Sequence, residues 1–286
     1  MGQLSQNRLK LGRISFLNVL PLYYPLETGV VSHPFSIVPG TPAYLNGLMT
    51  KGDLDLSVVS SIEYARHPER YLILPDLSIS CRGPVKSVLL LSRLPLKDLS
   101  DETVLVSTQS HTSVALIKIL LSCHLGVDAS FTPGSCTETL ARGERPAAFL
   151  AIGDEALRLD RHDLYPYRWD LGEAWHSWTG LPFVFAIWVI QREAVVRDNG
   201  NLDAAIGALL SAKKWGREHP DTICSEAARQ GILGYRELRD YYQCLRYDLG
   251  AGEKKGLEIF YEYLVKIGEV AEAPRIEICS PLALVA

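Results

Sequence analysis

The sequence has no long hydrophobic run and no large surplus of charge of one sign. Its longest apolar stretch, Leu181–Ile190, is too short for the ~20 residues that a membrane-spanning helix requires. The formal net charge of −4 gives no general attraction to nucleic acid or anionic membranes. The beginning of the chain, MGQLSQNRLKLGRIS, has neither the apolar core nor the cleavage site of a secretory signal. We therefore expect a cytoplasmic protein that binds neither nucleic acid nor membrane.

The six cysteines and seven histidines form no metal or redox motif. No two cysteines stand in CxxC spacing, and a chain of 286 residues can bury a core without disulfides. We expect most of the cysteines to be small buried side chains in a reducing compartment. The histidines never pair at the spacing of metal ligands. The sequence therefore predicts no metal site.

The motifs of several common enzyme classes are absent as well. The sequence contains no GxGxxG, no GxxxxGK(S/T), no HExxH and no GxSxG. These absences argue against dinucleotide and ATP chemistry and against a serine hydrolase. The composition, 47% hydrophobic and 22% charged, is ordinary for a soluble globular protein.

The first strongly patterned segment is Arg13–Tyr24, RISFLNVLPLYY. Its apolar residues up to Leu17 suit a buried strand, and Pro21 stands where a helix can begin. Asn18 lies between these two elements. A polar side chain at the end of a parallel strand is where α/β folds place ligand contacts, but asparagine is also a preferred helix cap. Both interpretations of Asn18 stay open at this point.

Strand and helix patterns alternate along the chain. Phe35–Val38 and Leu54–Val59 continue the series that begins near residue 12, and three such units predict a parallel sheet. Ser60 and Glu63 have the spacing of a capping box. A second series begins near residue 95, with a helix over Val114–Leu125 that Gly126 ends. After Arg192 the pattern predicts four amphipathic helices, over residues 202–219, 221–230, 235–247 and 253–270.

These patterns predict an α/β protein with two lobes and a ligand cleft between them. Lobe one comprises residues 1–90 and 191–286, including the C-terminal helices, and lobe two is the inserted segment 91–190. The two crossings, near VLLLS and FAIWVI, would form a hinge. The apolar faces of the C-terminal helices leave a homodimer open.

Polar turns at the carboxyl ends of the predicted strands supply the candidate binding residues. They are Asn18, Ser60, Ser61, Ser87, Thr112, Ser113, Asp154, Thr179 and Gly180. Ser60-Ser61 and Thr112-Ser113 open predicted helices, where free backbone N–H groups and the helix dipole favour anions. One such turn in each lobe would hold a molecule with two anionic groups. Taken singly, each turn is also explained as a plain helix cap.

Other polar and aromatic side chains have two possible roles. The Ser87 hydroxyl lies in the apolar run Val85–Ser92 and must bond either a ligand or the backbone. Asp154 could contact a ligand or cap a helix, and His111 and His176 are acid–base candidates by position only. We expect an aromatic cluster to lie mostly in the core, with one or two rings free to wall an apolar ligand. It comprises Trp175, Trp178, Phe183, Phe185 and Trp188.

Together these segments resemble the periplasmic-binding-protein-like enzymes of menaquinone biosynthesis by the futalosine route, and most of all the chorismate dehydratases. The resemblance rests on strings found in the expected order: RISFLNVLPLYYPLE, DLDLSVVSSIEYA, KSVLLLS, HTSVALIKILL, AIGDEAL and DLGEAWHSWTGLPFVFAIW. It implies a two-lobed type II periplasmic-binding-protein-like fold with no metal or organic cofactor. Two positions depart from the family pattern, since Phe16 stands where tyrosine is common and Val19 where threonine is common.

The resemblance implies that chorismate, a small-molecule substrate, is converted to 3-[(1-carboxyvinyl)oxy]benzoate and water. Chorismate carries two carboxylates on a small apolar ring, which suits a cleft with two anion anchors. The asparagine and serine implicated in catalysis in the family match Asn18 and Ser87, which would orient the substrate and hydrogen-bond developing charge. A mechanism proposed for the family uses the enolpyruvyl carboxylate of the substrate as the base.

Two alternatives remain open in the sequence. The sister enzyme that makes 1,4-dihydroxy-6-naphthoate shares the fold, and its larger, nucleoside-bearing substrate would need a wider and more polar cleft. A non-catalytic solute-binding protein for a small anion has the same fold too, and function resides in the site rather than the fold. The expected absence of a secretory signal argues against this second alternative.

Overall fold

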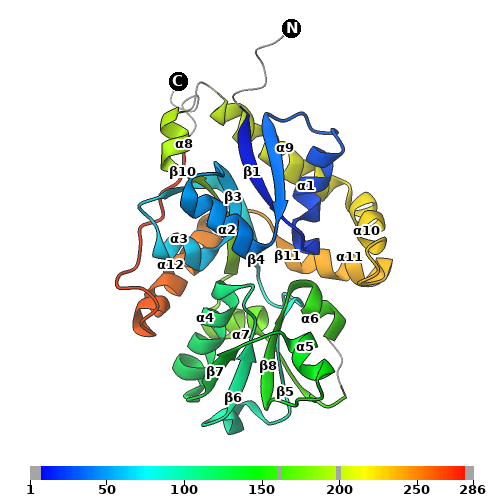
Figure 1. The fold of residues 1–286 in the computed structure, drawn as a ribbon, viewed down its shortest axis with the longest axis vertical. Helices are drawn as coiled ribbons and strands as arrows, with labels where there is room; N and C mark the ends of the chain where they lie inside the picture. Colours follow the sequence, from blue (N-terminus) through cyan, green and yellow to red (C-terminus); the bar gives the residue numbers. More distant parts are fainter. Residues whose placement is uncertain (1–7, 160–162, 198–200, 281–286) are drawn as a thin grey trace.

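The computed structural model describes residues 8–159, 163–197 and 201–280, which form two α/β lobes (Figure 1). The upper lobe in the figure contains a six-stranded sheet, and the lower lobe contains a five-stranded sheet. The α/β fold class with two lobes, predicted from the alternating patterns, is therefore confirmed.

The sheet of the first lobe is mixed. In order across the sheet its strands are β11 (Leu245–Arg246), β4 (Tyr71–Cys81), β10 (Phe183–Gln191), β3 (Leu56–Ser60), β1 (Leu9–Ile14) and β2 (Phe35–Gly40). β1 is parallel to both β2 and β3, as the three βα units predict. β10 runs antiparallel between β3 and β4 and pairs Ala186 with Ser60. The carboxyl end of β3 and the first half of β10 therefore lie side by side.

The sheet of the second lobe is also mixed. Its order is β7 (Ser130–Pro133), β6 (Thr103–Val106), β8 (Ala148–Ile152), β5 (Val88–Ser92) and β9 (Tyr167–Asp170). β6 is parallel to β7 and β8, whereas β5 is antiparallel to β8 and β9. Because Val88 pairs with Ile152, the start of β5 lies beside the end of β8. Ser87 thus precedes its strand, and our prediction that it lies at a carboxyl end was wrong.

Helices cover the sheets of both lobes (Figure 1). Those of the first lobe are α1 (Leu20–Glu27), α2 (Pro42–Lys51), α3 (Ser61–Arg66), α8 (Arg192–Arg197), α9 (Leu202–Glu218), α10 (Pro220–Ala228), α11 (Tyr235–Cys244) and α12 (Ala251–Lys266). Those of the second are α4 (His111–Ile119), α5 (Cys136–Ala141), α6 (Gly153–Leu159) and α7 (Leu171–Thr179). A 3₁₀ turn, η1 (Leu17–Val19), joins β1 to α1, and another, η2 (Leu96–Leu99), precedes β6. A π-helical turn, η3 (Leu120–Leu125), continues α4.

Local sequence signals explain several helix boundaries. Pro21 lies in the first turn of α1, and the Thr41 side chain accepts a hydrogen bond from the Tyr44 N–H at the start of α2. Gly126 has φ +67° and ends η3, as expected for a glycine stop. The capping box predicted for Ser60 is wrong, because the Ser60 side chain makes no capping hydrogen bond.

The strands at the two crossings belong to different lobes than their position in the sequence suggested. β5 begins in the second lobe at Val88, and β10 belongs to the sheet of the first lobe although we expected residues 91–190 to form lobe two. The apolar run of β10 is buried between β3 and β4, a pairing that hydropathy alone does not reveal. We propose that the lobes divide at residues 82–87 and 180–182. Residues 1–7, 198–200 and 281–286 of the expected lobe one, and residues 160–162 of the expected lobe two, lie outside the described ranges.

Most side chains of the predicted aromatic cluster are buried in the core. Trp175, Phe183 and Trp188 are fully buried, while Trp178 is half-buried. Four of the six cysteines are buried, as expected, and all six are free thiols. In the ranges that the structure describes, every helix is too short or too polar to cross a membrane.

Candidate active site

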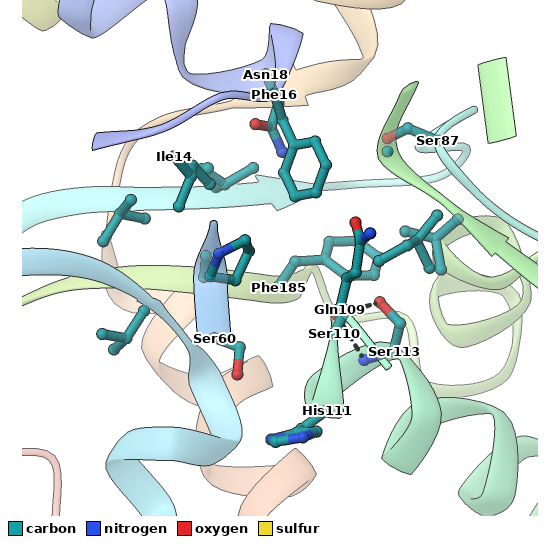
Figure 2. A pocket seen from close by; sticks show the side chains of 18 of the residues that line it. Ile14, Phe16, Asn18, Ser60, Ser87, Gln109, Ser110, His111, Ser113 and Phe185 are labelled. Carbon is teal, nitrogen blue, oxygen red and sulfur yellow. Dashed lines mark hydrogen bonds between the residues drawn. The ribbon is translucent and has the colours of Figure 1, made fainter. Parts of the chain in front are cut away.

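A cavity of about 140 Å³ lies where the two lobes face each other. Its first-lobe wall comes from β1, η1, β3 and β10, and its second-lobe wall from the segment before β5 and the start of α4 (Figure 2). The lining includes four of the predicted site residues, Asn18, Ser60, Ser87 and Ser113. The structure thus brings together polar turns that are far apart in the sequence.

The walls of this cavity are largely apolar. Ile14, Phe16 and Phe185 line it from the first lobe, so one ring of the predicted aromatic cluster does face the cavity. Gly153 begins α6 opposite Phe16 with φ +55°, and a Cβ built there would come within 3.2 Å of the Phe16 ring. A glycine is therefore required for the lobes to approach at this point.

Asn18 lies on η1 and caps no helix. The Asn18 Oδ1 atom is buried and has no hydrogen-bond partner within the described part of the chain. The Tyr247 hydroxyl donates to the Asn18 carbonyl at 2.8 Å, and the Tyr242 hydroxyl donates to the Leu17 carbonyl at 2.9 Å. The backbone of this turn is fixed, whereas its amide group is left for a ligand. An unpaired buried polar atom is costly unless a ligand satisfies it.

Ser87 is also buried and is held by neighbouring groups. Its hydroxyl lies 3.4 Å from the Val85 carbonyl, to which it donates, and accepts from the Tyr241 hydroxyl at 3.3 Å. Burial raises the pKa of Tyr241 well above its ordinary value, so this phenol stays protonated and can donate. The carboxylate of Asp170 accepts from the Val85 and Lys86 N–H groups and fixes the path of the turn.

The start of α4 forms the second-lobe side of the cavity. The Ser110 hydroxyl accepts from the Ser113 N–H at 3.3 Å and lies 2.9 Å from the Ser113 hydroxyl. The first N–H groups of the helix, those of His111 and Thr112, have no intrahelical acceptor. Ser60 lies on the facing lobe, on the same side of Phe185 as Ser110 (Figure 2). Free N–H groups and hydroxyls at such a helix start favour an anionic group.

The hydroxyls of Ser61 and Thr112 are used within the protein. The Ser61 hydroxyl donates to the Val184 carbonyl at 2.6 Å. The Thr112 hydroxyl accepts from the Ile62 N–H at 3.0 Å, which joins the two lobes directly. Neither residue is among those that line the cavity. Their contribution to binding is therefore limited to the helix starts on which they lie.

Asp154, Thr179 and Gly180 do not line the cavity. The Asp154 carboxylate accepts from the Leu17 N–H at 3.2 Å, so it links the second lobe to the turn that carries Asn18. Burial raises the pKa of Asp154. The Thr179 hydroxyl donates to the Trp175 carbonyl, and Gly180 ends α7 with φ +71°. We therefore leave Thr179 and Gly180 out of the proposed site.

Among the residues that the structure describes, His111 is the only histidine, acidic or basic residue that lines the cavity. The Arg66 guanidinium lies 3.3 Å from His111 Nδ1. Because a guanidinium only donates, Nδ1 is the acceptor and the ring proton of neutral His111 is on Nε2. His111 then offers an N–H group and not a base. In the described ranges, no three histidine, cysteine or acidic side chains gather into a metal-binding cluster.

Sequence reasoning missed the residues that hold the two polar side chains in place. Tyr241, Tyr242 and Tyr247 come from the C-terminal part of the chain, where the amphipathic pattern indicated only helix packing. A signal was present, because a buried tyrosine hydroxyl needs a hydrogen-bond partner. The partner could not be identified without the tertiary structure.

Comparison with known proteins bears on the family and the fold of the chain. A family model described as menaquinone biosynthesis matches residues 9–266. A chorismate dehydratase of Thermus thermophilus is 32% identical over 270 residues, which cover 89% of this chain and 94% of that relative.

Two solved structures share the fold at low sequence identity. A protein from Archaeoglobus fulgidus superposes with a TM-score of 0.76 at 15% identity, covering 93% of this chain and 100% of that one. The periplasmic aliphatic sulphonate binding protein of Escherichia coli superposes with a TM-score of 0.65 at 14% identity, covering 95% and 96%. The periplasmic-binding-protein-like fold expected from the sequence is confirmed.

Proposed function

The chain belongs to the menaquinone-biosynthesis family that includes the chorismate dehydratases, and on this premise we propose how its cavity acts on chorismate. It is an enzyme, a carbon–oxygen lyase, that converts chorismate to 3-[(1-carboxyvinyl)oxy]benzoate and water. The C3–H and C4–O bonds break, the proton and the hydroxide leave as water, and the ring becomes aromatic. The products are favoured, so the enzyme mainly has to orient the substrate and ease removal of the proton.

The observation that carries the catalytic proposal is the unpaired amide oxygen of Asn18 in the wall of an apolar cavity. Asn18 and Ser87 lie toward the same end of the cavity, on different lobes (Figure 2). The Tyr247 hydroxyl fixes the backbone of Asn18, and the Tyr241 hydroxyl holds the side chain of Ser87. Such fixed dipoles orient the ring and stabilise charge as it develops, without reorganisation during the reaction.

We infer that the two carboxylates of chorismate are held by the helix starts at Ser60 and Ser113. No lysine or arginine of the described ranges lines the cavity, so N–H groups, hydroxyls and helix dipoles would bind the dianion. The apolar rings of Phe16 and Phe185 provide a surface for the cyclohexadiene ring.

The cavity offers no carboxylate side chain as a base from the part of the chain that the structure describes. His111 offers an N–H group through Nε2, for the reason given above. This arrangement supports the mechanism in which the enolpyruvyl carboxylate of the substrate removes the C3 proton. The role of the protein is then to hold that carboxylate next to C3 and to keep it poorly solvated.

The two alternatives left open by the sequence are not favoured. A cavity of about 140 Å³ with apolar walls suits one small ring better than a nucleoside-bearing substrate. The family match and the dehydratase relative also argue against a transport protein. A cytoplasmic location and a homodimer stay predictions.

Incubation of the purified protein with chorismate tests this function. Mass spectrometry should detect a product lighter by one water, and proton NMR should identify an aromatic ring, with no cofactor added. Unchanged chorismate, together with no thermal stabilisation of the protein by chorismate, would refute the proposal.

The catalytic assignment is tested by Asn18→Ala and Ser87→Ala. Each should lower kcat by roughly 100-fold or more, a loss on the scale of that seen when one preorganised polar group is removed from an active site. Ser92→Ala is a matched control, since Ser92 is a buried serine at the other end of β5 whose hydroxyl donates to the Leu94 carbonyl. Near-normal turnover in Asn18→Ala and Ser87→Ala would remove both residues from the mechanism.

A further inference from the structure

A second cavity, of about 310 Å³, lies behind the turn that carries Asn18. It is lined by the start of α1, by α9, α10 and α11, and by the segment after α11, all of which pack on one side of the first lobe (Figure 1). Leu245 lines both this cavity and the one between the lobes. The two cavities therefore lie back to back.

The second cavity has an apolar floor. Ile223, Cys224 and Leu245 are buried and line it, and Pro21 adds a further apolar surface. Two tyrosine side chains, Tyr242 and Tyr247, complete the wall nearest to Asn18. A floor of this kind suits the apolar body of a small molecule.

The charged residues of the second cavity leave positive charge unpaired. The Lys213 ammonium is neutralised by Asp76 at 2.6 Å and by Asp248 at 2.8 Å, and among the described residues Asp248 is the one acidic residue that lines the cavity. Arg239 lines the cavity too and pairs with Asp221 at 2.9 Å. Arg217 and Arg246 also line it, and neither guanidinium has a carboxylate partner within the described ranges. Two spare guanidiniums beside an apolar floor are complementary to a carboxylate on an apolar body.

We propose that this second cavity binds a small carboxylic acid with an apolar ring or chain, and that its occupancy changes the position of Asn18. Arg217 and Arg246 bind the carboxylate, and the apolar floor receives the rest of the molecule. The binding claim is independent of the reaction, whereas the effect on turnover rests on the proposed role of Asn18.

The coupling follows from the two tyrosines. Tyr242 and Tyr247 line the second cavity and donate hydrogen bonds to the carbonyls of Leu17 and Asn18. Burial raises the pKa of both phenols far above their ordinary value, so both remain donors. A ligand that moves either ring moves the turn that carries the Asn18 amide.

Binding is tested by isothermal titration calorimetry with 1-naphthoate as the probe and 1-naphthylmethanol as its neutral counterpart. The acid should bind and the alcohol should bind at least about tenfold more weakly, because charge-assisted hydrogen bonds are lost. The double variant Arg217→Gln/Arg246→Gln should weaken naphthoate binding by a similar factor. Arg236→Gln, an exposed arginine of α11 that lines neither cavity, should bind as the wild type does.

Three results would overturn the binding claim. They are equal binding of acid and alcohol, unchanged binding to Arg217→Gln/Arg246→Gln, and loss of naphthoate binding on addition of saturating chorismate to the Asn18→Ala variant. The last result would mean that the probe occupies the cavity between the lobes.

The coupling is tested by turnover of chorismate with and without saturating 1-naphthoate. The kcat should change at least twofold in the wild type and Arg236→Gln, and should not respond to naphthoate in Arg217→Gln/Arg246→Gln. A Tyr242→Phe/Tyr247→Phe variant should still bind naphthoate but should lose the response of kcat. Unchanged kcat in the wild type at saturating probe would overturn the coupling. A protein that binds naphthoate but never dehydrates chorismate would instead refute the proposed function.

Discussion

Removal of one hydroxyl that never contacts the substrate should slow the reaction measurably. In Tyr241→Phe the ring still fills its buried site, but the donor to the Ser87 hydroxyl, 3.3 Å away, is lost. A neutral hydrogen bond of this kind contributes ~1 kcal/mol. If that energy serves to hold Ser87 in its reactive orientation, kcat falls by about fivefold.

The same substitution should have a small and separable effect on folding. The Ser87 hydroxyl keeps the Val85 carbonyl as an acceptor, so the free energy of unfolding in urea should fall by no more than ~1 kcal/mol. Tyr23→Phe is a matched control, because Tyr23 is equally buried and donates one hydrogen bond to the Gly12 carbonyl at 2.6 Å. Tyr23→Phe should lower stability by a similar amount and leave kcat unchanged.

A double-mutant cycle decides whether Tyr241 acts through Ser87. In the Ser87→Ala background there is no hydroxyl left to orient, so Tyr241→Phe should cause no further loss of kcat. The kinetic loss should also be independent of pH between 6 and 9, because burial keeps Tyr241 protonated throughout. A full fivefold loss in the Ser87→Ala background would refute the positioning role, as would equal kinetic losses for Tyr241→Phe and Tyr23→Phe.

Two further predictions concern stability and pH. Burial raises the pKa of Asp154 above 3.8, although the Leu17 N–H opposes this, so its folded state holds the proton more tightly. Part of the free energy of unfolding is therefore present below pH 3.8 and lost as the pH rises through the raised pKa of Asp154, and urea titrations of Asp154→Asn should lack this decline. Burial alone would raise the pKa of Glu269, but hydrogen bonds from Lys118 and Arg66 outweigh it and lower the pKa below 4.5. The stability from this contact between the lobes should be present above pH 4.5 and lost below it, and a Glu269→Gln variant with the same acid sensitivity as the wild type would contradict this.

The sequence predicted the elements of this protein better than their assembly. Pro21 and Gly126 act locally, and the helix boundaries predicted from them are confirmed. The position of Ser87 could not be predicted, because it depends on the antiparallel pairing of β5 with β8, which involves residues about sixty positions apart. Hydropathy identified the run in β10 as buried but not the sheet to which it belongs.

The residues of the candidate site also differ in whether local sequence or tertiary structure determines their role. Asn18 and the start of α4 could be selected because a polar residue at a strand end or helix start has few local roles. The Ser61 and Thr112 hydroxyls looked equally suitable, yet they bond Val184 and Ile62 inside the protein. Only the tertiary structure distinguishes a hydroxyl that faces a cavity from one that has found a partner.

The turn that carries Asn18 is held through hydrogen bonds to its main chain, and this determines which of its side chains can be substituted. Tyr242, Tyr247 and Asp154 bond the carbonyl and N–H groups of Leu17 and Asn18, and those groups exist whatever side chains the turn carries. Residues 16 and 19 can therefore differ between relatives while the turn keeps its path, which accounts for a phenylalanine and a valine at these positions. Leu17 and Val19 are fully buried, so apolar substitutions of similar size should be tolerated there more readily than loss of a hydrogen-bonding group at the three distant residues that hold the turn.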